Sequence, residues 1–201
     1  MRRVRLRNVP LTEGSPMGQN QPMLLRSTRI DSPFGALTVH VSEKGVRALQ
    51  WPGDDDRTFV GDDEILDDEI LDDTSGSLAA TRLLDEMVAQ LTDYFAGRRI
   101  AFDLPLDVIG TEFQRSAWSV LCDIPYGETI SYGEQARRLG DARKARAVGG
   151  ANGRNPVPII VPCHRVIGAD GSLTGFGPGV DSKKWLLAHE TAVASKASVS
   201  T

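Results

Sequence analysis

The chain has 201 residues, enough for one large domain or two small ones with a buried core. With 40% hydrophobic residues and only two cysteines, the composition excludes a disulfide-stapled scaffold, and no apolar run reaches the roughly 18 residues of a membrane span. The net charge of −4, taken alone, weighs against a polyanionic partner such as nucleic acid. We expect a reduced, cytoplasmic setting, because no apolar signal-peptide core follows the N-terminus.

The charge is unevenly distributed along the chain. Residues 53–73 hold 11 acidic side chains and one basic one, so the other 180 residues carry a net charge of +6. So dense a run of like charge repels itself and offers little apolar surface, which predicts a solvated acidic loop. A calcium site is not expected there, because the regular alternation and the glycine of a calcium loop are missing. Residues 1–23 and 191–201 are predicted to be polar tails.

The first patterned block covers residues 24–105. Short β-type runs at 24–30, 37–42 and 46–51, separated by turn residues, predict an antiparallel meander. Apolar side chains then recur at helical spacing over 78–97, with a glycine at the end, which predicts a helix. This block therefore has the pattern of a small α+β domain, with the acidic loop as an insertion.

The second block, residues 106–190, is predicted to be mainly helical. Thr111, Ser131 and Asp141 are each suited to cap the start of a helix. A short helix, a glycine-containing break and a second helix of small residues outline a helix-turn-helix. Residues 137–154 carry six basic side chains and one acidic one, a local patch that suits contact with phosphates despite the negative total.

Residues 155–166 are the most informative stretch, a proline-bracketed β-branched run that leads into a cysteine and a histidine. We expect a stiff, buried, extended segment in which a cysteine beside His164 and Arg165 favours its nucleophilic thiolate form. Adjacent side chains of an extended chain point to opposite sides, so cooperation of Cys163 with His164 requires a bridging water, and Glu190 is the candidate carboxylate to orient the imidazole. Arg165 and Lys183 fit plain surface cations equally well.

Other cysteine chemistries fit this pattern less well. Two cysteines and three histidines give no paired zinc-ligand spacing, and a zinc deaminase needs a second cysteine two residues after the first. A thiol protease needs its cysteine and histidine to face each other from separated positions. We therefore expect neither a metal nor a cofactor.

A series of motifs runs in order and without gaps over about 80 residues, from 111 to 190. They are Phe113-Gln114-Arg115, Trp118, Ile124-Pro125-Tyr126-Gly127-Glu128-Thr129, Ser131-Tyr132, Arg146-Ala147-Val148-Gly149, Asn152, Asn155-Pro156 and Pro162-Cys163-His164-Arg165-Val166. Together they resemble the O6-alkylguanine-DNA alkyltransferases, and Asp31-Ser32-Pro33-Phe34-Gly35 loosely resembles the N-terminal domain of that family. The acidic loop and the long N-terminal tail depart from it.

The resemblance implies an α+β fold, with a small N-terminal RNase H-like α/β domain followed by a mainly helical winged helix-turn-helix domain. It implies repair of double-stranded DNA by transfer of an alkyl group from O6-alkylguanine, or O4-alkylthymine, to Cys163. The damaged base is flipped out, and the protein is irreversibly alkylated after one turnover. The partner is DNA rather than a membrane, and the protein is a monomer that binds DNA singly or cooperatively.

The resemblance also implies a role for each site residue. Cys163 accepts the alkyl group, His164 acts as base through water, Glu190 polarises His164, and Asn155 braces the turn. Tyr132 rotates the nucleotide phosphate and donates a proton toward the base. Arg146 replaces the extruded guanine in the stack, and the other expected DNA contacts are Ala145, Ala147, Gly149, Asn152, Arg154 and again Tyr132.

The substrate pocket implied by the resemblance is formed by Val161, Cys163, Trp118, Phe176, Pro178 and Lys183, with the carbonyls of Val161 and Cys163 reading the guanine edge. Phe176 stands where many relatives have a tyrosine, so a hydrogen bond to O6 is not expected. Pro178 stiffens or narrows the pocket. Two alternatives stay open: a lesion sensor without chemistry, whose relatives lack the acceptor cysteine, and a thiol hydrolase with repeated turnover.

Overall fold

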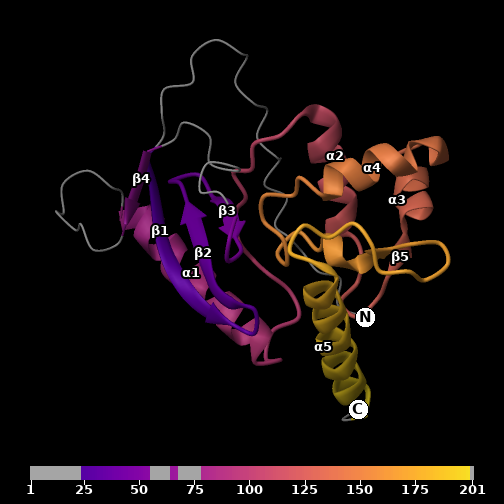
Figure 1. Cartoon of the computed structure of the whole chain (residues 1–201). Helices are drawn as coiled ribbons and strands as arrows, with labels where there is room; N and C mark the ends of the chain where they lie inside the picture. Colours follow the sequence, from indigo (N-terminus) through magenta and orange to yellow (C-terminus); the bar gives the residue numbers. More distant parts are fainter. Residues whose placement is uncertain (1–23, 55–63, 68–77, 200–201) are drawn as a thin grey trace. The chain divides into compact units, whose positions relative to one another are not determined.

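The computed structural model describes residues 24–54, 64–67 and 78–199 (Figure 1). The chain divides into two compact units, with the boundary between Ile109 and Gly110. The predicted tail 1–23 and most of the predicted acidic loop fall outside the described residues.

The N-terminal unit is a four-stranded sheet with one helix along one face (Figure 1). Strands follow the order β3-β2-β1-β4, with antiparallel pairing of β1 with β2 and of β2 with β3, as the meander predicts. The elements are β1 (Leu24–Ser32), β2 (Gly35–Val41), β3 (Val46–Gln50), β4 (Glu64–Asp67) and α1 (Leu78–Phe95).

The core of this unit lies between the sheet and α1. Leu84, Met87 and Leu91 of the helix and Leu37 and Val39 of β2 are all at most 1% exposed. Each such side chain contributes roughly 1.5–3 kcal/mol on leaving water, so the unit has a hydrophobic core of its own.

The prediction of a loop over residues 53–73 is wrong for β4. Residues Glu64–Asp67 pair in parallel with the first residues of β1, from Leu24↔Glu64 to Ser27↔Asp67. The sequence places Ile65 and Leu66 together between the acidic residues, and counting charge over the whole segment concealed this short β-type run. The rest of the segment beyond Asp54 lies outside the described residues.

The N-terminal unit also extends past its predicted end at residue 105. Val46 donates its backbone N–H to the carbonyl of Pro105 at 2.8 Å and accepts from the N–H of Asp107 at 2.9 Å. The Asp107 carboxylate accepts from the Ser42 hydroxyl at 2.6 Å and pairs with Arg47 at 3.3 Å, all in buried surroundings. These bonds tie the segment to β3, and the boundary therefore falls after Ile109.

The C-terminal unit is mainly helical, as predicted. Its helices are α2 (Glu112–Cys122), α3 (Tyr132–Arg138), α4 (Ala145–Asn152) and α5 (Val180–Val199), with two 3-10 turns, η1 (Ala142–Lys144) and η2 (Cys163–Arg165). The two-residue strands β5 (Ile130–Ser131) and β6 (Val166–Ile167) pair in parallel. None of the described helices combines the length and apolar character needed to cross a membrane. The wing of a winged helix-turn-helix stays a prediction.

The three predicted caps are confirmed. The Thr111 side chain accepts from the backbone of Gln114, whose own side chain accepts from the Thr111 N–H, a complete capping box. Ser131 caps α3, and Asp141 caps η1, the 3-10 turn that leads into α4. The caps fix where α2, α3 and the turn before α4 begin, so they define the helix-turn-helix outline.

The predicted C-terminal tail is helical up to Val199, because α5 continues through it. Residues 191–199 contain three alanines and neither glycine nor proline, so nothing local ends the helix. Ala194 packs against Gly127, where an added methyl group would lie 3.2 Å from the Ala194 Cβ. Gly127 also has a φ of +76°, so both its conformation and its neighbour demand glycine.

Gly127→Ala is expected to destabilise the protein by about 2–4 kcal/mol, because it combines a left-handed φ with overpacking against α5. Gly140→Ala is the matched control, since Gly140 has a φ of +92° but open space around it. It should lose only about 1–2 kcal/mol. Urea unfolding of both variants provides the comparison, and equal losses would show that the contact with Ala194 contributes nothing.

Candidate active site

The segment that carries Cys163 is a compact turn, which corrects the predicted extended conformation. Val161 donates its N–H to the carbonyl of Val157 at 3.0 Å, and Ile159 has a φ of +75° while being 1% exposed. A β-branched residue in the left-handed region is strained and persists only where its surroundings enforce it. The prolines restrict φ but do not require an extended chain, and the turn ends in the 3-10 helix η2.

Asn155 supplies the bonds that close this turn. Its carboxamide oxygen accepts from the N–H of Val157 at 3.1 Å, and its Nδ2 donates to the carbonyl of Val161 at 2.7 Å. The same Nδ2 donates to Sγ of Cys163 at 3.2 Å. Asparagine side chains stabilise turns in this way, so Asn155 both braces the turn and fixes the sulfur.

The Cys163 thiol is neutral at rest, contrary to the expectation of a favoured thiolate. Cys163 is 4% exposed, and burial raises the pKa of its thiol to about 11, although the hydrogen bond from Asn155 and the charge of Lys183 act in the other direction. Arg165 does not assist, since its guanidinium is engaged elsewhere. The sulfur therefore needs a base before it can act as a nucleophile.

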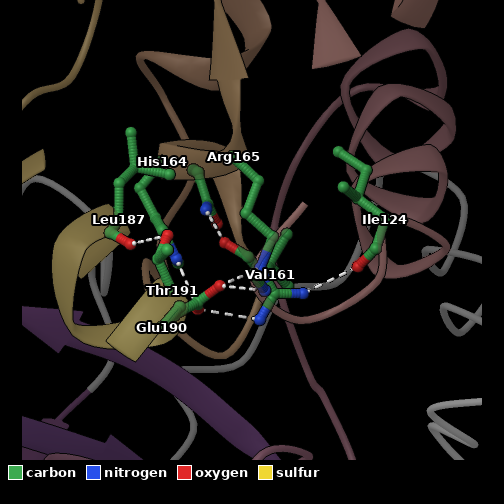
Figure 2. Close-up of polar contacts among 9 residues, drawn as sticks. Ile124, Val161, His164, Arg165, Leu187, Glu190 and Thr191 are labelled. Atoms are coloured by element: carbon green, nitrogen blue, oxygen red, sulfur yellow. Dashed lines mark hydrogen bonds and ion pairs between the residues drawn. The ribbon is translucent and has the colours of Figure 1, made fainter. Parts of the chain in front are cut away.

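Glu190, which is fully buried, is the centre of a polar network (Figure 2). Its Oε1 accepts from Nε2 of His164 and from Arg165 at 2.9 Å, and its Oε2 accepts from Arg165 and from the N–H of Gly127 at the same distance. Burial acts to raise the pKa of Glu190, but the hydrogen bond from His164 and the charge of Arg165 hold it well below its usual range. Glu190 is thus a permanent anion.

That anion determines the protonation of His164. An ionised carboxylate only accepts, so Nε2 of His164 carries the proton and Nδ1 carries the lone pair. Burial lowers the pKa of His164 below 6.5, which keeps the ring neutral at pH 7. Nδ1 is buried, and among the described residues no group donates to it or accepts from it. His164 therefore has the correct tautomer for a general base.

Neither Arg165 nor Lys183 is a surface cation. Arg165 is 5% exposed and donates to the carbonyl of Ile124 at 2.7 Å (Figure 2). Its guanidinium carbon lies 5.5 Å from the ring centre of Tyr126. Lys183 is 0% exposed and donates to the carbonyls of Val166 and Thr174, each at 2.6 Å. Both cations join separate segments of the C-terminal unit around the site.

The loop after β6 is fastened next to Cys163 and His164. The Tyr132 hydroxyl donates to the same Thr174 carbonyl at 2.9 Å, and Nζ of Lys183 lies 5.7 Å from the ring centre of Tyr132. Phe176 of this loop meets the His164 ring edge-on at 6.4 Å. Phe176 and Lys183 therefore lie at the site, and Pro178, which is half-buried, belongs to the same loop.

The predicted DNA-contact residues divide into two groups. Arg146, Ala147 and Arg154 are exposed on or just after α4, and Ala145 and Gly149 are half-buried. Gly149 lies beside the Tyr132 ring, since a methyl group added to this glycine would lie 3.7 Å from that ring, so the start of α3 is adjacent to α4.

Asn152 departs from its predicted role as a DNA contact. It is 3% exposed and exchanges two hydrogen bonds with Gln135, so the structure assigns it to packing between helices.

Two residues predicted to line the pocket already take part in hydrogen bonds within the protein. The Val161 carbonyl already accepts from the N–H of Cys163 at 2.8 Å and from Asn155, so both lone pairs are used and it is not free to read a guanine edge. Trp118 is 2% exposed and donates its indole N–H to the carbonyl of Ala151 at 2.9 Å, which joins α2 to α4. A pocket role for Trp118 stays a prediction.

The residues missed at the sequence level act mostly through the backbone or as buried polar groups. The N–H of Gly127 and the carbonyl of Thr174 carry no side-chain signal. Gln135 does have one, since it occupies an otherwise apolar position beside Ala136 on α3 and is 0% exposed. Groups of three or more metal-ligating side chains do not occur within the described ranges of the chain.

The C-terminal unit thus combines a buried thiol next to a histidine with a helix-turn-helix outline that exposes Arg146 and Arg154, an arrangement typical of a cysteine-dependent enzyme that acts on DNA. The family models for 6-O-methylguanine DNA methyltransferase match the chain in two places, the ribonuclease-like domain at residues 25–108 and the DNA binding domain at residues 112–192. The chain belongs to the 6-O-methylguanine DNA methyltransferase family, and its activity is that of a methylated-DNA–protein-cysteine methyltransferase.

Individual relatives agree with this assignment. The methylated-DNA–protein-cysteine methyltransferase of Mycolicibacterium paratuberculosis is 50% identical over 80% of this chain and 89% of its own length, and that of Methanosarcina barkeri is 43% identical over 80% and 94%. The crystal structure of Mycobacterium tuberculosis OGT in complex with DNA matches with a TM-score of 0.69 at 41% identity, covering 85% of this chain and 94% of that one. The predicted α+β fold is confirmed at this level.

Replacing Arg165 by methionine is expected to destabilise the protein by about 3–5 kcal/mol at pH 7, because it leaves the Glu190 carboxylate buried without its cation. In the double variant Arg165→Met/Glu190→Gln the buried charge is gone, so part of that loss should be recovered. Chemical denaturation measures both. If the double variant is no more stable than the single one, the buried charge of Glu190 is not the source of the loss.

Proposed function

We propose that the protein repairs O6-alkylguanine in duplex DNA by transferring the alkyl group to Sγ of Cys163 in a single turnover. The observation that carries the proposal is the pairing of a buried neutral thiol with a histidine whose Nδ1 is free to take a proton. A thiol with a pKa of about 11 reacts slowly without a base, and Glu190 leaves His164 in the required tautomer.

The proposed reaction moves the alkyl group to sulfur and leaves a neutral guanine. The Sγ–H proton passes through one water to Nδ1 of His164, and the sulfur forms a bond to the alkyl carbon. The bond from that carbon to O6 breaks, its electron pair goes to the guanine, and a proton donated from Tyr132 neutralises the base. The Tyr132 phenolate and the His164 imidazolium that remain return to their neutral forms when one proton passes from His164 to Tyr132 through water. Water cannot displace the resulting thioether, so the protein is consumed. Neither a metal nor a cofactor takes part.

The burial of the sulfur supports base flipping as part of the proposal. Cys163 is 4% exposed, so a base stacked within a duplex cannot reach it. Arg146 is exposed on α4 among small side chains, which permits close approach to the minor groove and replacement of the flipped base in the stack. Arg154 and the small residues Ala145, Ala147 and Gly149 complete this surface, and similarity to a relative solved with DNA supports DNA as the partner.

The pocket favours small adducts in this proposal. Phe176 has no hydroxyl to bond O6 and lies against the His164 ring. Pro178 accepts a hydrogen bond from Ser182 at its carbonyl, which stiffens the loop. We extend the proposal to O4-alkylthymine as a second substrate, because its alkyl group is also carried on an exocyclic oxygen. We further propose that the protein acts in the reduced cytoplasm, where the acceptor stays a thiol. Action as a monomer and cooperative binding along DNA remain predictions.

Incubation of the protein with methylated duplex DNA is expected to add one methyl group, about 14 Da, to Cys163. Cys163→Ala should bind the same duplex with unchanged affinity and gain no mass, because only the acceptor atom is removed. Intact mass and peptide mapping measure the transfer. Binding without any mass gain by the unaltered protein would indicate a lesion sensor, and repeated turnover of esters would indicate a hydrolase.

The pH profile tests the role of His164. With His164 as base, the single-turnover rate at saturating DNA should be level from pH 7.5 to 9, since burial lowers the pKa of His164 from its ordinary value and raises that of Cys163 to about 11. The rate should fall only at lower pH, where the imidazole becomes protonated. In His164→Gln the rate should be lower and should rise about tenfold per pH unit, following the thiolate fraction. A rate that rises in this way in the unaltered protein would exclude His164 as the base.

A further inference from the structure

A closed pair of buried side-chain amides joins three helices of the C-terminal unit. Nε2 of Gln135 on α3 donates to Oδ1 of Asn152 on α4 at 3.1 Å, and Nδ2 of Asn152 donates back to Oε1 of Gln135 at 2.8 Å. Nε2 of Gln135 also donates to the carbonyl of Ala117 on α2 at 3.0 Å. The two side chains are 0% and 3% exposed, so the pair is shielded from water.

The surroundings of the pair explain why directional bonds matter there. The side chains buried around these helices include small ones, among them Ala117, Ala136, Val148 and Ala151. Small apolar side chains interlock less than large ones and hold the relative position of two helices less tightly. A reciprocal amide pair has one good geometry and a cost of about 1–3 kcal/mol if a partner is lost, so it favours a single arrangement.

The element held in this way is α4. A second bond, from the Trp118 indole to the carbonyl of Ala151, anchors it one residue away from Asn152. Both anchors lie at the C-terminal end of α4, and Arg146 and Ala147 are exposed toward its other end. Gln135 lies one turn after Tyr132 on α3. The pair therefore relates the helix of Tyr132 to the helix of Arg146.

We propose that the Gln135–Asn152 pair orients α4 so that Arg146 and Tyr132 act on the same nucleotide. Both are positioning residues: they contact neither the acceptor sulfur nor the His164–Glu190 network among the bonds described. The proposal rests on the proposed function and adds that affinity for DNA depends on an internal amide pair that has no access to solvent.

The test replaces both amides by apolar side chains, Gln135→Leu/Asn152→Leu, so that neither partner is left buried and unpaired. We expect the thermal midpoint to be unchanged or higher. The Kd for methylated duplex should rise about tenfold, because a small misorientation of α4 separates Arg146 from Tyr132. The rate of methyl transfer from free O6-methylguanine base should stay within about twofold, since that reaction needs no α4 contact.

The matched control is Gln90→Leu in the N-terminal unit. Gln90 is also buried and bonds the backbone of Asp103 through both its amide nitrogen and oxygen. Its loss should leave the Kd for DNA unchanged. The single variant Gln135→Leu leaves Asn152 unpaired and should lower the thermal midpoint, which the double variant restores.

A double variant that is stable and binds DNA with unaltered Kd overturns the proposal, because the pair then only fills space. A double variant that loses stability, DNA binding and free-base transfer together also overturns it, since the role is then general packing. Failure of the proposed function is distinguishable, because it shows in the unaltered protein as an absence of transfer from methylated DNA.

Discussion

The C-terminal unit depends on one buried anion, the carboxylate of Glu190. Four hydrogen bonds reach its two oxygens, from His164, from two nitrogens of Arg165 and from the backbone of Gly127. Those donors come from η2 and from the turn after α2, while Glu190 itself lies on α5. A charge without water must have such partners, so the carboxylate fixes three segments in space while it selects the tautomer of His164. The Glu190 carboxylate therefore both stabilises the fold of this unit and sets the protonation state of His164.

The same principle extends around the site. Lys183 is fully buried, and its charge is neutralised by no carboxylate in the bonds described but is solvated by two carbonyls. Burial lowers the pKa of Lys183, while the nearby Cys163 raises it. The charged groups of Arg165, Lys183 and Glu190, which are costly to bury, are therefore matched to partners. The site keeps its shape through directional bonds in addition to hydrophobic packing.

Much of the fold and of the site could be predicted from the sequence. Caps such as Thr111 and Ser131 can be predicted locally, because a hydroxyl side chain just before an amphipathic run favours an N-cap hydrogen bond to the first turn of a helix. The linear motif around Cys163 and His164 identified the chemistry. The strand β4 was missed because its pairing partner lies some 40 residues earlier, and pairing over such a distance leaves no mark in local charge.

The burial of individual side chains at the site could not be predicted from the sequence. Arginine and lysine side chains usually lie at the surface, so the sequence alone predicts that Arg165 and Lys183 are exposed. Only the tertiary structure shows that both are buried. The prediction of a thiolate at Cys163 was wrong for the same reason. The neighbouring residues in the sequence suggested a lowered pKa, whereas burial raises the pKa of this thiol. Asn152 likewise resembles an ordinary polar residue of a helix until its bonds with Gln135 are seen.

The enclosure of Cys163 has a consequence for how such a protein persists in a cell. In the proposed single-turnover reaction each molecule must stay unreacted until it meets its target. Cysteines are lost to oxidants in proportion to their thiolate character and accessibility. A sulfur that is 4% exposed, with a pKa of about 11, is low on both counts. The burial that makes a base necessary for the proposed reaction also protects Cys163 of the unreacted protein from oxidation.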